Sequence, residues 1–271
     1  MSFKINKLVP FSVLLILAGL SACKNGDNAA PASQNCRILH QVDSSDANDG
    51  SEKHTYNYTY DSAGRVKAIQ VLYHNNADNL NYDWLNEYSY APGRVYLKIG
   101  SRLDSAVLDA EGRVSAYGVS TLGSSAFSFS YDAEGHLISK TESRSSSVTT
   151  YNITWDNGNN TRVIMKRQNQ FATDYDTITN TFTSHVRNRT YFYNMMNVYS
   201  NYPAVMFGTP AKNLLMESVI RSGGVVSGRT VYSYTFANGN EIPTQVKITR
   251  TGGPSDTTVI GTYTNTVYNC N

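Results

Sequence analysis

Side chains that could bind a metal ion occur in the sequence, but their spacing does not suit one. Each histidine stands without a second histidine or cysteine at ligand spacing: His40, His54, His74, His136 and His185. The densest acidic stretch lacks the order of acids and glycine that a calcium loop needs: Asp43, Asp46, Asp49 and Glu52. A solvated hairpin loop is the better interpretation of this stretch, with weak calcium binding as the alternative. We therefore predict no metal site and no cofactor.

Two pairs of carboxylates could suggest glycoside hydrolysis, which needs two acids about 5–10 Å apart around a sugar. The pairs are Asp109 with Glu111 and Asp132 with Glu134. Both lie inside a repeated turn motif, where the aspartate already has a structural task. The sequence contains neither a Gly-x-Ser-x-Gly elbow nor a phosphate-binding glycine loop. We predict no catalytic residue and no enzyme; a hydrolase assembled from distant residues is the least favoured alternative.

Tyrosine is the most abundant aromatic residue, with 20 Tyr against 9 Phe. Its ring is a flat apolar body with a hydrogen-bonding tip. One interpretation is a half-hydrated core face of a thin sheet. The other is a platform for a sugar or a peptide. The platform predicts that six side chains are exposed together in a groove: Tyr56, Tyr58, Tyr88, Tyr90, Tyr232 and Tyr234.

The elements that would position these residues are β-strands. Aromatic and small polar residues alternate along residues 56–60, 127–131, 151–155 and 232–236. A period of two places all the rings of a strand on one face and the Ser, Thr and Asn side chains on the other. The sequence shows no extended helical periodicity with caps. We therefore expect an all-β protein in which aromatic rings stack across neighbouring strands.

A repeated motif joins these strands. Residues 60–66 (Tyr-Asp-Ser-Ala-Gly-Arg-Val) recur at 108–114 and at 131–137, where His136 takes the arginine position, with looser copies at 90–95, 155–158 and 236–239. Asp109, Asp132 and Asp156 are spaced by 23 and 24 residues, the length of one hairpin. Aspartate caps a tight turn, and glycine supplies its positive φ angle. The repeats predict one strongly curved antiparallel meander sheet of hairpins; they leave open whether this sheet closes, in part or fully, into a barrel.

One region departs from this pattern. Residues 194–213 are apolar but interrupted by prolines, including Tyr202-Pro203 and Thr209-Pro210. We expect a long loop that lies over one end of the core. A gate over a ligand cavity is the functional alternative.

The N-terminus is not part of the folded domain. Lys4 and Lys7 precede an apolar run of about ten residues, which is typical of a secretory signal and too short for a membrane-spanning helix. The signal ends in Leu20-Ser21-Ala22-Cys23, which resembles the lipobox of bacterial lipoproteins. The resemblance implies a signal peptide at 1–22, lipid on Cys23, and sorting to the outer membrane because Lys24 follows. Residues 23–35 then form a lipidated flexible tether, and residues 36–271 form one domain.

Charge and cysteine content limit the partners and the compartment. Removal of Lys4 and Lys7 leaves 21 of the 23 Lys and Arg residues against 21 Asp and Glu, a formal charge of zero. Nucleic-acid binding requires clustered cations, so we predict no nucleic-acid partner and no membrane contact beyond the lipid. Cys36 and Cys270 are the remaining cysteines, and the compartment is oxidising. We predict a disulfide between them; two buried free thiols are the alternative.

The Tyr-Asp-x-x-Gly-Arg units resemble the YD repeats of Rhs-type surface proteins. The chain also resembles a family of uncharacterised bacterial lipoproteins with a porin-like antiparallel fold, through the turn at Trp155 to Asn159, Lys212 to Leu215 and the strand Tyr232 to Phe236. The resemblance implies a curved meander sheet and no known activity.

Together these features predict a non-catalytic outer-membrane lipoprotein that faces the periplasm or the cell surface. It would bind a glycan, a peptide or an envelope protein through its curved sheet. The alternative is an assembly subunit that pairs through a sheet edge.

Overall fold

The computed structural model describes residues 36–45, 52–75, 79–119, 125–186, 202–236, 243–252 and 257–270. All of them belong to one compact unit that spans residues 35–271. The predicted signal peptide, Cys23 and the predicted tether lie outside the described residues.

The described residues form sixteen β-strands and one short 3₁₀ turn, η1 (Ala204–Phe207). The strands are β1 (Cys36–Ser45), β2 (Glu52–Tyr60), β3 (Val66–Asn75), β4 (Leu80–Ala91), β5 (Arg94–Ile99), β6 (Arg102–Leu108), β7 (Val114–Val119), β8 (Ser125–Tyr131), β9 (Leu137–Arg144), β10 (Ser147–Asp156), β11 (Asn159–Asn169), β12 (Thr173–Val186), β13 (Asn213–Ser222), β14 (Val225–Phe236), β15 (Pro243–Thr251) and β16 (Thr257–Cys270).

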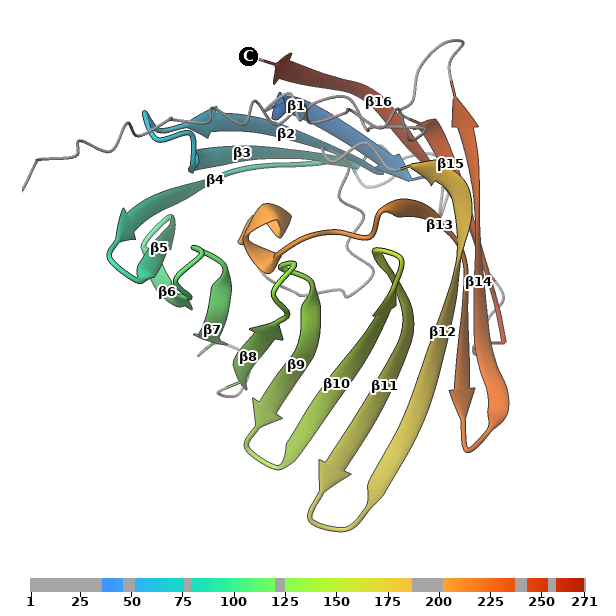
Figure 1. Ribbon diagram of the computed structural model, residues 1–271. Helices are drawn as coiled ribbons and strands as arrows, with labels where there is room; N and C mark the ends of the chain where they lie inside the picture. Colours follow the sequence, from blue (N-terminus) through green and yellow to red (C-terminus); the bar gives the residue numbers. More distant parts are fainter. Residues whose placement is uncertain are drawn as a thin grey trace, which may run out of the picture. The chain divides into compact units, whose positions relative to one another are not determined.

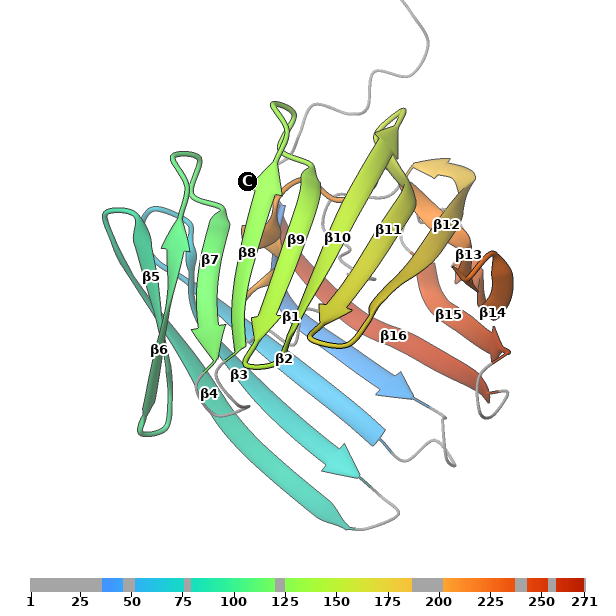
Figure 2. The same cartoon turned by 90° about the horizontal axis from the view of Figure 1, so that it is seen from below.

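The strands form an antiparallel meander in which each strand pairs with the strands before and after it in the chain. Because β1 pairs with both β2 and β16, the sheet closes on itself into a barrel. Figure 1 shows the strands in chain order around a ring, from β1 in blue to β16 in red, and Figure 2 shows the ring from below. The predicted all-β antiparallel meander of hairpins is confirmed; the sequence left closure into a barrel undecided, and the pairing of β1 with β16 decides it.

The alternation of aromatic and polar residues has the predicted consequence. In β8, Phe129 is buried while Ser128 and Ser130 on either side of it are exposed. In β14, Tyr232 is buried and Ser233 is exposed. The aromatic face is the inner face of the barrel, since it packs against the segment that Figure 1 draws inside the ring of strands.

The barrel has two distinct ends, because successive turns of a meander alternate between them. The turns after even-numbered strands lie at the repeat end, where the chain forms the Asp-x-x-Gly turns at residues 61–65, 109–113 and 132–136. The turns after odd-numbered strands lie at the other end, which we name the short-turn end; they include residues 100–101, 145–146 and 223–224.

Residues 202–212 are the described part of the connection between β12 and β13, and they fill the barrel at the repeat end. Tyr202, Met206 and Phe207 are buried in the main core cluster. The rings of Tyr202 and Phe207 lie 5.5 and 6.4 Å from that of Tyr117 in β7. The loop is therefore irregular and covers an end of the core, as predicted for this part of it; residues 194–201 lie outside the described residues.

The described residues include no helix with the length and apolar character needed to cross a membrane.

Candidate functional site: the turn at Asp132 and the charged inner wall

The acidic pairs of the repeat have structural tasks. The Asp109 carboxylate accepts hydrogen bonds from the backbone N–H groups of Glu111 and Arg113, at 3.1 and 2.8 Å. The Arg113 guanidinium then pairs with both acids, at 2.7 Å to Asp109 and 2.9 Å to Glu111. Gly112 has the φ angle of 79° that such a turn needs. These two carboxylates are engaged by a cation and the turn backbone, which is not an arrangement for acid–base chemistry.

Each basic residue of the repeat also contacts the next hairpin. The guanidinium of Arg113 lies over the Tyr131 ring, 4.5 Å from its centroid, in a cation–π contact. The Tyr131 hydroxyl donates to the Val114 carbonyl oxygen at 2.7 Å. The same two contacts join Arg65, Val66 and Tyr90. A tyrosine therefore joins one hairpin to the next. A guanidinium group of the preceding turn lies over the face of its ring, and its hydroxyl group donates a hydrogen bond to a backbone carbonyl oxygen just after that turn.

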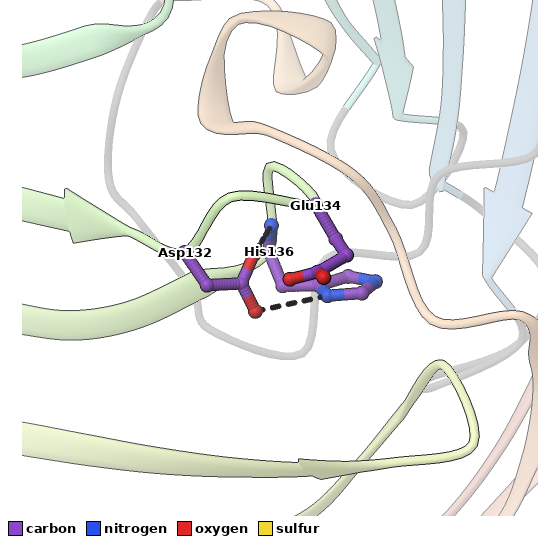
Figure 3. Close-up of side chains that lie close together, drawn as sticks. All are labelled: Asp132, Glu134 and His136. Carbon is purple, nitrogen blue, oxygen red and sulfur yellow. Dashed lines mark hydrogen bonds and ion pairs between the residues drawn. The ribbon is translucent and has the colours of Figure 1, made fainter.

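The turn at residues 132–136 repeats this geometry with histidine in place of arginine (Figure 3). His136 Nδ1 lies 3.1 Å from the Asp132 carboxylate, and the His136 backbone N–H donates to the other oxygen at 2.7 Å. The imidazole stacks on Trp155 with 4.3 Å between ring centroids. Trp155 donates its indole N–H to the Leu137 carbonyl oxygen at 2.8 Å, which completes the same link between hairpins.

Asp132, Glu134 and His136 offer three ligand atoms that all lie within 4.8 Å of one another. The sequence places no second histidine or cysteine at ligand spacing from His136; in the structure the tight turn brings two acids, Asp132 and Glu134, close to it. Burial acts to raise the pKa of Asp132, but the hydrogen bonds from the His136 backbone and side chain hold this pKa below its ordinary value. Since Arg113 occupies the equivalent place in its own turn, His136 has the same structural role of partner to the turn aspartate.

The predicted tyrosine platform is not present. Tyr88 and Tyr232 are buried, and the other four members are partly buried rather than exposed. The set is also divided between two clusters: Tyr56, Tyr58, Tyr88 and Tyr90 pack in the main core, and Tyr232 and Tyr234 pack with Leu215 and Ile248. The expectation of joint exposure was wrong because the aromatic face became the inner face of a filled barrel end.

The other sequence candidates are dispersed. His40 Nδ1 lies 2.7 Å from Asn57 Oδ1, the His54 ring packs against Tyr73, and His74 contacts Asn81. The side chains of the acidic stretch from Asp43 to Glu52 and of His185 lie outside the described set. The backbone places Cys36 directly opposite Cys270 in the β1–β16 pairing. The disulfide between them stays a prediction.

A group that the sequence did not indicate lies on the inner face toward the short-turn end. Glu142 and Arg144 share the inner face of β9 and form an ion pair at 2.6 Å. Arg167 of β11 pairs with Asp176 of β12, and Ser222 donates to the same carboxylate at 2.5 Å. The side chains of Arg144 and Arg167 are 62% and 50% exposed. Solvent therefore reaches the inner face at this end, whereas the repeat end is filled by apolar residues.

Lys140 lies where the charged and apolar parts of the inner face meet. It is only 4% exposed, and its ammonium nitrogen lies 4.9 Å from the centroid of the Tyr151 ring and 5.5 Å from that of Phe127. Burial lowers the pKa of Lys140, although Glu142 acts in the opposite direction. A buried cation among aromatic rings is a common feature of ligand sites. The sequence position of a single lysine does not predict such a setting.

The fold and the inner wall define an antiparallel meander of hairpins with an apolar core at one end and a charged inner face at the other. Among solved structures, the chain is similar to a porin-like protein from Bacteroides uniformis ATCC 8492, with a TM-score of 0.60 and 17% identity, over 84% of this chain and 97% of that one. A second likeness is to a chain of the TcdB2-TccC3-TEV crystal structure, with a TM-score of 0.33 and 12% identity, over 73% of this chain and 8% of that one. No family model and no curated protein matches the chain. The first likeness supports the fold alone.

Proposed function

We propose that the protein is a non-catalytic binding protein of the bacterial cell envelope, held at the outer membrane by lipid on Cys23. Its ligand, a glycan or a peptide, would enter the barrel from the short-turn end. The observation that carries this proposal is the half-exposed pair of inward-facing arginines, Arg144 and Arg167, because they line an inner face that solvent reaches. β1 begins at Cys36 at the repeat end, so the two exposed arginines lie toward the opposite end of the barrel from the start of β1.

The polarity of the described strands favours a lipid anchor over direct insertion of the barrel. A bilayer-spanning barrel needs an apolar outer face and a polar interior. Here the outer face carries charged pairs in mid-strand, such as Lys98 with Glu87 at 3.1 Å, and Arg229 with Glu217. Rings such as those of Phe129 and Tyr232 instead face inward.

The alternative of an assembly subunit needs a surface for its partner. Each described strand already pairs on both sides, so a partner would meet the outer face of the barrel and not a free strand edge. The binding role is therefore the better supported of the two.

Two measurements test the proposal. The full-length chain, purified in detergent from a bacterial host, is applied to a glycan array and a peptide array. We expect retained ligands whose binding Arg144→Gln weakens and Arg229→Gln, on the outer face, leaves unchanged. Silence on both arrays would contradict the binding role.

Cys23→Ser should move the protein from the membrane fraction to the soluble fraction and abolish labelling by a palmitate analogue; retention in the membrane would contradict the anchor.

A further inference from the structure

The charge at Lys140 is not balanced by its surroundings. The charged groups that act on it are Glu142 and Arg144, and these two form an ion pair with each other. Within this group of three side chains, two cations stand against one anion, which leaves one positive charge in excess beside Lys140. No hydrogen bond or ion pair links the Lys140 ammonium group to any of the described residues, and its nearest partners are the rings of Phe127 and Tyr151.

Such an arrangement costs stability in the free protein. An ammonium group in this setting loses most of its hydration, and cation–π contacts return only part of that loss. A methionine or leucine at this position would fill the space without the cost. A ligand that brings one negative charge would remove the imbalance.

The neighbouring groups indicate what else the ligand would carry. Lys140 pairs with Tyr151 across the β9–β10 ladder, and Ser147 and Thr149 lie on the same face of β10. This face offers one cation, an aromatic ring and two hydroxyl groups. The ring can pack against the C–H face of a sugar, the hydroxyls can bond to its hydroxyls, and the cation can bind a carboxylate. A single excess charge favours a carboxylate over a doubly charged phosphate, which Glu142 would also repel.

We propose that Lys140 and Tyr151 form the centre of a binding site for a carboxylate-bearing saccharide on the inner face of the barrel. The site rests on the proposed binding function and specifies its ligand class. The sugar ring lies against Tyr151, its carboxylate bonds to the Lys140 ammonium group, and Arg144 and Arg167 attract the anion from the short-turn end.

The test compares two disaccharides that differ in their carboxylates. Digalacturonate and galactobiose are titrated by calorimetry into the full-length protein in detergent. We expect digalacturonate to bind at least tenfold more tightly than galactobiose. Lys140→Met should reduce digalacturonate binding at least tenfold, Lys140→Arg should retain part of it, and Lys98→Met on the outer face should have no effect. Equal binding of the two disaccharides, or unchanged binding by Lys140→Met, would overturn the inference.

A second readout separates a ligand role from a structural one. If Lys140 is kept for its ligand, the free Lys140→Met variant should unfold at a temperature about 2–4 °C higher than the wild type, because an unbalanced buried charge is gone. A lower unfolding temperature would mean that the lysine holds the barrel together. Array binding by neutral glycans or peptides, without digalacturonate binding, would reject this inference and leave the proposed function intact. Silence on the arrays and in calorimetry would reject both.

Discussion

The hydroxyl of Tyr131, at the end of β8, donates a hydrogen bond to the carbonyl oxygen of Val114, at the start of the preceding strand β7, at 2.7 Å. This bond gives a structural reason for the aromatic residue before Asp132, as the Trp155 bond to Leu137 does for the one before Asp156. The ring that ends one hairpin covers the basic residue of the preceding turn and is tied to the backbone beyond it.

Removal of this hydroxyl should weaken the barrel. Tyr131→Phe keeps the ring and leaves a part-buried carbonyl oxygen without its donor, so we expect a loss of about 1–2 kcal/mol in the free energy of unfolding. Chemical denaturation measures it. Tyr175→Phe, at a tyrosine that is 56% exposed, is the matched control and should change little. Equal effects of the two variants would show that the link between hairpins contributes nothing.

The histidine turn can be converted into the arginine turn. His136→Arg should place a permanent cation between Asp132 and Glu134 and over Trp155, as Arg113 does in its own turn. We expect a gain of about 0.5–1 kcal/mol in the free energy of unfolding. The reverse variant, Arg113→His, should lose a similar amount under the same conditions. A loss of stability in His136→Arg would mean that the two turns are not equivalent.

Stability at low pH should depend on Asp132. Its pKa is lowered in the folded protein from the ordinary 3.8, so the unfolded chain takes up the proton at a higher pH than the folded one does. This contribution is complete above the unfolded pKa and is lost as the pH falls through the folded value. Asp132→Asn should therefore show a shallower loss of stability below pH 4 in acid titrations followed by circular dichroism.

A comparison variant is available in the sister turn. The Asp61 pKa is also lowered, by the backbone hydrogen bond from Arg65 ahead of its other partners. Asp61→Asn should flatten the acid transition in the same direction. An unchanged transition in both variants would refute the link between these turns and acid stability.

Gly208 is where the inner loop meets the repeat turns. Its φ and ψ angles of 88° and −164° are almost restricted to glycine, and an added Cβ would collide with the Gly135 carbonyl oxygen and the Tyr131 ring. Gly208→Ala should cost about 2–4 kcal/mol in thermal or chemical unfolding. Gly223→Ala also has positive φ but meets open space, so about 1 kcal/mol is expected there. Similar costs at both sites would argue against close packing of the loop.

The pairing of β1 with β16 makes the predicted disulfide between Cys36 and Cys270 directly testable. Cys36 and Cys270 are opposite each other, and opposed residues of an antiparallel pair have Cα atoms about 4.5–5.5 Å apart, within disulfide range. Mass spectrometry of the non-reduced, alkylated protein should find both thiols blocked. Cys36→Ser should cost about 2–5 kcal/mol under oxidising conditions. Free alkylation of either thiol in the native protein would contradict the bond.

The sequence by itself determined the strands, the turns and the sorting of side chains, because these depend on local chemistry. The alternation around Phe129 and the Asp-Gly spacing of the turns need only neighbours along the chain. Even the cluster at Asp132 was readable in principle, since His136 stands where the other copies have arginine.

Tertiary structure alone decided which face would be the inside. Alternation assigns rings and polar groups to opposite faces but does not say which face encloses the core; closure of β1 on β16 decided that and buried Tyr88 and Tyr232. The setting of Lys140 likewise depends on three strands and on the loop that fills one end of the barrel. Burial and charge balance arise from groups brought together across the barrel. The spacing of residues along the chain therefore does not predict them.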